Sequence, residues 1–261
     1  MRFDIEIRGS GPPVLFLPGS YSTPRAWAPM FDLIEGWQML SVSLPGYGTT
    51  PERRRPGACH MADMTGFVTE VAERIGAPFH LVGHSFGGQI ALAAALEGTL
   101  PILSLITFEA NPIYARHADA DFAWRSDTDA MVRRFEEAVA AQDRQAAGII
   151  IDYWSSPGTF AAMPEPIRAF CADTAGTNLL DWKTAQTFTP ELEAFAALNM
   201  PCTLCRGGLA NAAIRDVTDL LTGIIPDSRQ EVVDGADHFL ISTHPGDCAR
   251  IVTDHLRRTS A

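Results

Sequence analysis

The sequence lacks long apolar runs, an excess of positive charge and any regular cysteine pattern. No stretch approaches the roughly 18 apolar residues of a membrane-spanning helix, so we expect none. The 20 Lys and Arg residues are outnumbered by 31 Asp and Glu, giving a net charge of −11. This balance argues against a nucleic-acid surface and against binding to an anionic membrane.

The start of the chain and its five cysteines bear on location. Residues 1–10 contain no apolar core of roughly 7–15 residues, so we expect no signal peptide. The cysteines are odd in number and scattered, which fits free thiols in a reducing compartment. These two features predict a cytoplasmic protein.

Motifs for metals and cofactors are also missing. We find neither a phosphate-cradling glycine loop nor a dinucleotide fingerprint. Cys202 and Cys205 form a C-x-x-C pattern, but they lie in an apolar run without a second pair, so we interpret them as core residues. We therefore expect no cofactor and no metal, and a small molecule as the binding partner. Homo-oligomerisation is left open.

The most informative motif lies at residues 81–88, which read Leu-Val-Gly-His-Ser-Phe-Gly-Gly. Within it, Gly83, Ser85 and Gly87 give the pattern G-x-S-x-G. An apolar strand-like run, 79–82, precedes the motif and an alanine-rich helix-like run, 89–97, follows it, which is the context that this motif requires. The glycines allow strand and helix to approach closely, and Ser85 stands exposed before a helix N-terminus. Ser85 is therefore our predicted nucleophile.

This strand–turn–helix unit resembles the nucleophile turn of the α/β-hydrolase superfamily, and the resemblance extends over nearly the whole chain. Pro18-Gly19 stands where the superfamily usually has His-Gly, after a short apolar strand. By this resemblance, the backbone N–H groups of Ser20 and Phe86 form the oxyanion hole. His238 follows a short strand near the C-terminus, where the superfamily keeps its catalytic histidine, and is the predicted general base.

The acid of the expected triad is less obvious. Its common position in the superfamily, after the strand at 202–205, holds Asn211, which carries no charge to stabilise imidazolium. Glu109 directly follows the strand at 102–108. The stretch Phe-Glu-Ala-Asn-Pro-Ile that contains it resembles the end of strand six in haloalkane dehalogenases, some of which place a catalytic Glu there. Neighbouring strand ends share one edge of a parallel sheet, so we predict Glu109 as the acid. Four weaker candidates are Asp216, Asp219, Asp234 and Asp237.

Alternating segments predict an α/β fold. Helical patterns at 61–75, 89–97 and 245–258 separate or follow apolar strand-like runs. This alternation indicates a mostly parallel sheet with helices on both faces, which is the α/β-hydrolase fold that the resemblance implies. The expected strands are 3–7, 14–17, 39–43, 79–82, 102–108, 202–205 and 230–233.

Residues 112–200 lose the strand signal and read as helices with breaks. By the resemblance, they form a helical cap inserted after the superfamily's sixth strand. We thus expect a core domain of residues 1–111 and 201–261, and a cap of residues 112–200. The cap holds eleven of the 23 aromatic residues, and some of them should line the pocket. An apolar acyl or alcohol group follows from this composition.

The predicted function is that of a serine hydrolase. It would cleave a carboxylic ester or thioester of a small, largely apolar substrate through an acyl-enzyme on Ser85. Amide, lactone or carbon–carbon hydrolysis and perhydrolysis use the same machinery and stay open. A non-catalytic protein that binds a small ligand is a further alternative, favoured by the missing acid at position 211.

Overall fold

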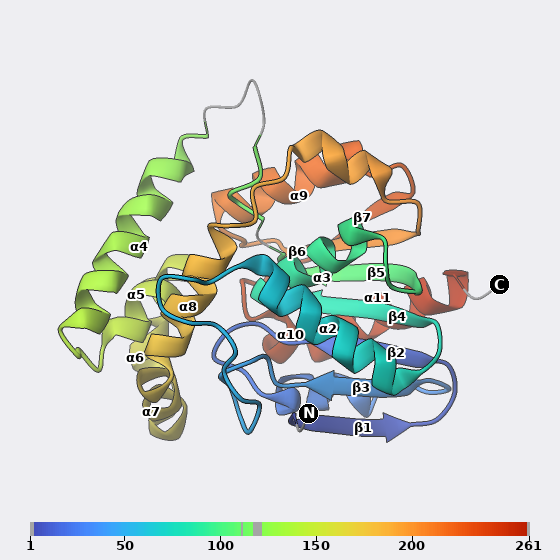
Figure 1. Ribbon diagram of the computed structural model, residues 1–261, viewed down its shortest axis with the longest axis horizontal. Helices are drawn as coiled ribbons and strands as arrows, with labels where there is room; N and C mark the ends of the chain where they lie inside the picture. Colours follow the sequence, from blue (N-terminus) through green and yellow to red (C-terminus); the bar gives the residue numbers. More distant parts are fainter. Residues whose placement is uncertain (1–2, 111, 117–121, 260–261) are drawn as a thin grey trace.

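A seven-stranded sheet forms the centre of the protein (Figure 1). The computed structural model describes residues 3–110, 112–116 and 122–259. The strand order is β1-β3-β2-β4-β5-β6-β7, with β1 antiparallel to β3 and every other neighbouring pair parallel. The mostly parallel sheet is therefore confirmed. The strands are β1 (Ile5–Gly9), β2 (Pro13–Leu17), β3 (Gln38–Val42), β4 (Phe79–His84), β5 (Ile102–Phe108), β6 (Cys202–Gly207) and β7 (Ser228–Val233).

The central strands are buried on both faces. In β2, Leu15 and Leu17 pack into one hydrophobic cluster, whereas Val14 and Phe16 pack into a second. Successive side chains of a strand point to opposite faces of the sheet. An uninterrupted apolar run therefore needs a helical layer on each side to keep both faces from water.

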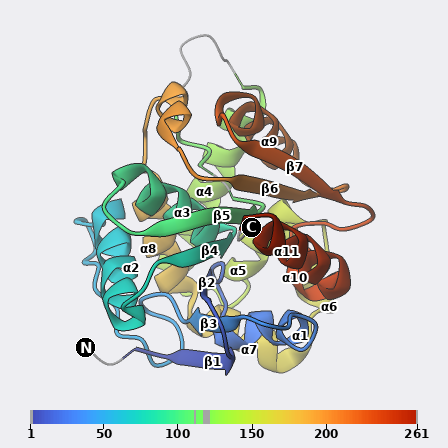
Figure 2. The same cartoon turned by 90° about the vertical axis from the view of Figure 1, so that its right-hand side faces the viewer.

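Two groups of helices provide these layers. One face is covered by α2 (Met61–Ile75), α3 (Phe86–Glu97) and α9 (Ala212–Ile224). The other is covered by η1 (Pro24–Trp27), α1 (Ala28–Phe31), α10 (Leu240–Thr243) and α11 (Pro245–Thr259). Figure 2 shows α2 and α11 on opposite sides of the sheet. The predicted α/β layering is thus confirmed.

Helices also fill the chain between β5 and β6. They are α4 (Trp124–Ala140), α5 (Ala146–Trp154), α6 (Thr159–Ala162), α7 (Glu165–Asp173), α8 (Ala175–Ala185) and η2 (Leu192–Ala197). Helices α4–α8 lie together at one side of the molecule, on the left in Figure 1. We did not predict α8, whose early Gly, Thr and Asn residues are weak helix formers. The expected domain boundary at residue 111 lies outside the described residues, and the division into two domains stays a prediction.

Within residues 3–110, 112–116 and 122–259, no helix is both long and apolar enough to cross a membrane.

Gly83 near the end of β4 and Gly87 in the first turn of α3 allow unusually close packing. A Cβ atom on Gly83 would lie 2.6 Å from the carbonyl oxygen of Gly87, and one on Gly87 would overlap the carbonyl oxygens of Leu17 and Pro18. The start of α3 thus rests directly on the backbone at the end of β2. Only a residue without a Cβ fits there.

This packing predicts opposite effects for two glycine substitutions. Gly87→Ala should lower the free energy of unfolding by about 1–3 kcal/mol, because the new methyl group overpacks the turn. Gly66→Ala, in the exposed part of α2 with no atom near its added Cβ, should raise it by about 0.5–1 kcal/mol. Urea unfolding measures both. Wild-type stability in Gly87→Ala would contradict the close approach.

Candidate active site

The register of β4 and β5 brings two predicted site residues together. His84 pairs with Phe108 at the ends of these parallel strands, so Ser85 and Glu109 are the next residues along each strand. Their backbones are fixed there, because Ser85 N–H donates to the Phe108 carbonyl at 2.9 Å and Glu109 N–H to the Cys205 carbonyl at 2.8 Å. The two side chains therefore start from neighbouring points on one sheet edge.

Both residues adopt a backbone conformation that side chains rarely take. Ser85 has φ 52° and ψ −122°, and Glu109 has φ 48°. Non-glycine residues in this region are strained and concentrate at functional sites. The strain at Ser85 comes from the sharp turn between β4 and α3, which leaves the serine at the tip.

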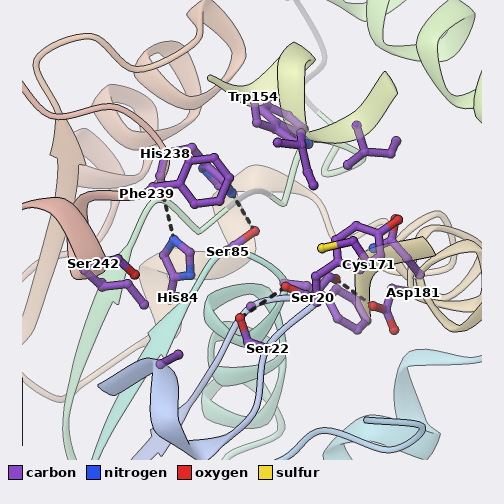
Figure 3. A pocket seen from close by; sticks show the side chains of 18 of the residues that line it. Ser20, Ser22, His84, Ser85, Trp154, Cys171, Asp181, His238, Phe239 and Ser242 are labelled. Atoms are coloured by element: carbon purple, nitrogen blue, oxygen red, sulfur yellow. Dashed lines mark hydrogen bonds between the residues drawn. The ribbon is translucent and has the colours of Figure 1, made fainter. Parts of the chain in front are cut away.

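A chain of hydrogen bonds joins three predicted residues. His238, from the loop after β7, faces Ser85 Oγ with Nε2 at 2.9 Å (Figure 3). On its other side, Nδ1–H donates to Glu109 Oε2 at 2.7 Å. Exposure is 9% for Ser85, 6% for His238 and 0% for Glu109. The structure thus brings the three residues together, while their catalytic roles stay a prediction.

The carboxylate of Glu109 is held at both oxygens. Oε1 accepts a hydrogen bond from Gly207 N–H at 2.8 Å, and Oε2 accepts from His238. A buried carboxylate requires hydrogen-bond donors, and a donor at each oxygen fixes its position. With the proton held at Nδ1, the Nε2 lone pair of His238 is free to accept the Ser85 hydroxyl proton.

Asn211, at the superfamily's common acid position, has a different role. It is the N-cap residue of α9, where its Oδ1 accepts from Ala213 N–H at 2.9 Å. Its Nδ2 donates to the Tyr153 carbonyl at 3.0 Å. An Asn side chain suits this position because it satisfies one of the free N–H groups at a helix start.

Three of the four weaker acid candidates accept hydrogen bonds from other side chains. Asp216 accepts from Trp124 Nε1–H at 2.9 Å and Asp219 from Gln230 Nε2–H at 2.6 Å. Asp234 is exposed. Asp237 accepts from the Ser155 hydroxyl.

Aromatic rings enclose the histidine. Trp154 of α5 stacks on His238 with a centroid distance of 5.7 Å and an angle of 28°, and Trp182 of α8 stacks in turn on Trp154. On the side of the sheet, His84 Nε2–H donates to the His238 carbonyl at 2.9 Å. Burial lowers the pKa of His84 to about 3, and the neighbouring His238 contributes to this lowering. His84 is therefore a neutral donor that fixes the loop.

The two predicted oxyanion residues border the same cavity as Ser85. Phe86 is the first residue of α3, so its N–H belongs to the first turn, where no helical carbonyl is available. Ser20 follows β2 and precedes Tyr21, which has φ 56°. Their part in an oxyanion hole stays a prediction.

The cavity above Ser85 is open to solvent, and the space between atoms there is about 950 Å³, part of which lies in the open mouth. Most of its wall is apolar, with Ile150, Ile151 and Trp154 from α5 and Trp182 from α8. In the described part of the chain, the lining contains no Lys or Arg and a single carboxylate, Asp181. Nor does this part hold a group of three or more His, Cys, Asp or Glu residues placed to bind a metal.

Asp181 is a buried lining residue that the sequence patterns did not single out. It is 2% exposed and contacts Ser20, Tyr47 and Arg54. A signal was available, because Asn178 and Asp181 are three residues apart and so share one face of a helix. That signal depends on recognising α8, which we did not predict.

Comparison with known proteins gives a family match and distant relatives. The profile of the Alpha/beta hydrolase family matches residues 14–251. An alpha/beta hydrolase from Sphaerobacter thermophilus has a similar structure, with a TM-score of 0.74, 21% identity and coverage of 97% of this chain and 96% of that one. At this identity, the structural similarity supports the fold alone.

Named relatives include two pimeloyl-(acyl-carrier protein) methyl ester esterases. The protein from Nitrosomonas europaea is 25% identical over 125 residues, 48% of this chain and 47% of that protein. The one from Aeromonas hydrophila is 22% identical over 257 residues, 97% of this chain and 98% of that protein. A 2-succinyl-6-hydroxy-2,4-cyclohexadiene-1-carboxylate synthase from Citrobacter koseri is 30% identical over 44% of this chain and 45% of that protein. The chain spans about half the length of the first curated relatives that it matches, such as the Nitrosomonas europaea protein.

The hydrogen-bonded chain predicts a large effect of Glu109→Gln. The amide can accept only one of the two N–H donors at this place, so it disfavours the Nδ1–H form of His238. The kcat for a p-nitrophenyl ester should fall by about 10³- to 10⁴-fold. The circular dichroism spectrum should stay that of the folded protein.

Asn211→Ala is the matched control for the acid position. It should lower the free energy of unfolding by about 1 kcal/mol through loss of the helix cap and leave kcat unchanged. If Asn211→Ala abolished turnover and Glu109→Gln did not, the acid assignment would be wrong.

Proposed function

The chain belongs to the alpha/beta hydrolase family, and on this premise we propose that it cleaves a carboxylic ester or thioester through an acyl-enzyme on Ser85. The observation that carries the proposal is the Ser85–His238–Glu109 hydrogen-bond chain at the floor of an apolar cavity. The predicted family and enzyme class, a hydrolase, are confirmed by the family match.

In the first half of the proposed reaction, Ser85 Oγ attacks the acyl carbon. His238 Nε2 takes the hydroxyl proton, and Glu109 stabilises the imidazolium that forms. The negative oxygen is held by the N–H groups of Ser20 and Phe86. When the ester bond breaks, His238 returns the proton to the leaving alcohol or thiol, and the acyl group stays on Ser85.

The second half releases the acid. A water molecule attacks the acyl carbon and gives a proton to His238. The bond from the acyl carbon to Ser85 Oγ then breaks, and the proton returns to Ser85. The sum of both halves is hydrolysis, with the serine and the histidine restored.

The cavity lining supports a small, uncharged acyl group. Trp154 and the neighbouring isoleucines of α5 offer apolar surface. The described lining residues include no Lys or Arg, so a free carboxylate on the acyl group of a substrate would find no such cation to pair with. Burying an unpaired carboxylate costs several kcal/mol. The name of the Citrobacter koseri relative contains both a succinyl and a carboxylate group. A compound with two carboxylates would therefore fit poorly in this cavity. The relatives named as methyl ester esterases are consistent with an ester substrate.

A pair of substrates of equal length tests this proposal. The kcat/KM for p-nitrophenyl valerate should exceed that for mono-p-nitrophenyl glutarate by at least about 100-fold, because only the second places a carboxylate in the cavity. Ser85→Ala should abolish both activities and also labelling by a fluorophosphonate probe. Equal or faster cleavage of the glutarate would contradict an uncharged acyl group.

A folded wild type that neither cleaves an ester nor reacts with the probe would instead favour the non-catalytic binding protein.

A further inference from the structure

A buried polar cluster lies beside the proposed oxyanion loop. Asp181 of α8 accepts a hydrogen bond from Ser20 Oγ–H at 2.6 Å through Oδ2 (Figure 3). The same oxygen accepts from Tyr47 Oη–H at 2.6 Å, and Oδ1 pairs with Arg54 Nη1 at 2.5 Å. These last two partners are 134 and 127 positions away from Asp181 in the sequence. One carboxylate of α8 therefore connects the loop after β2 with the segment between β3 and α2.

The ion pair at the centre of this cluster is fully enclosed. The side chains of Arg54 and Asp181 are 0% and 2% exposed. Arg54 also donates to Glu52 and to the Pro45 carbonyl. Burial alone would lower the pKa of Arg54, but Asp181 and Glu52 outweigh it and raise that pKa, so the guanidinium stays charged. Buried ion pairs contribute little net stability, which leaves the placement of Asp181 to be explained.

The loop that Asp181 holds is both strained and close to the nucleophile. Tyr21, directly after Ser20, has φ 56°, a conformation that persists only where surrounding contacts impose it. A Cβ atom on Gly19, directly before Ser20, would lie 3.1 Å from the Ser85 Cβ. The Ser20 hydroxyl is thus an anchor between a strained residue and a glycine that leaves no room for a side chain beside the nucleophile.

We propose that Asp181 is a positioning residue for the oxyanion hole, holding the Ser20 side chain so that the Ser20 N–H points at the developing oxyanion. The inference rests on the proposed function. Oxyanion donors act only when their direction is fixed before the reaction begins. Asp181 can supply that restraint because Arg54 and Tyr47 fix its own carboxylate. In this way α8, which belongs to the chain between β5 and β6, sets the geometry of a loop of the sheet.

Ser20→Ala tests the proposal with the least disturbance. It keeps the Ser20 backbone N–H and the Arg54–Asp181 pair, and removes only the hydroxyl anchor. The kcat for p-nitrophenyl valerate should fall by about 10-fold or more, within the range of roughly 10²–10³ for complete loss of one donor. KM should change little, because the substrate contacts stay in place.

A thionoester provides a readout that a merely structural role would not move. Sulfur accepts hydrogen bonds weakly, so the wild type should prefer the oxygen ester over the matching p-nitrophenyl thionoester. Ser20→Ala should reduce this preference together with kcat. Asp181→Asn should do the same, and if that variant does not fold, Ser20→Ala alone decides. Ser126→Ala, the same change at an exposed residue of α4, should leave both values at the wild-type level.

The outcomes separate the two proposals. Unchanged kcat and an unchanged oxygen-to-sulfur preference in Ser20→Ala, with an active wild type, would overturn the positioning role and leave the esterase proposal intact. A wild type without activity on any ester would overturn both.

Discussion

The parallel pairing of β4 with β5, in constant register from His80 to His84, is the constraint on which the site depends. It places Ser85 and Glu109 directly after two neighbouring strands, and the N–H of each donates to the adjacent strand. Their backbones are therefore fixed by the sheet before any side chain makes contact. A slip by one residue would turn the side chains of a strand to the opposite face and separate the serine from the carboxylate.

This register also explains how a carboxylate reaches His238 from the strand next to that of the serine. Glu109 enters from the strand next to that of the serine, and its carboxylate reaches His238 while Gly207 N–H holds the other oxygen. The loop after β6 is thereby free of an acid, and Asn211 serves as the cap of α9. The site thus has a buried carboxylate next to the histidine, with a hydrogen bond at each of its oxygens. This carboxylate does not come from the superfamily's common position.

The helices between β5 and β6 do more than close the cavity. Trp154 stacks on His238, and Asp181 holds Ser20, so this segment touches both the loop of the histidine and the loop after β2. The apolar side of α5 and Asp181 of α8 line different parts of the cavity. An uncharged acyl group fits this arrangement because Arg54, already bound to Asp181 and Glu52, is not available to a substrate.

Local patterns in the chain were enough to predict the features that neighbouring residues encode. Apolar runs indicate the strands, and the glycines around Ser85 indicate the turn, since close packing there tolerates no Cβ. His238 was predicted from its place in the family pattern. Glu109 was predicted from the resemblance to the end of strand six in haloalkane dehalogenases, together with the rule that parallel strand ends share an edge. Helix α8, the Trp154–His238 stack and the Asp181–Arg54 pair became visible only in the folded chain. These contacts join segments that lie far apart in the chain, and no local periodicity encodes which distant side chains will meet.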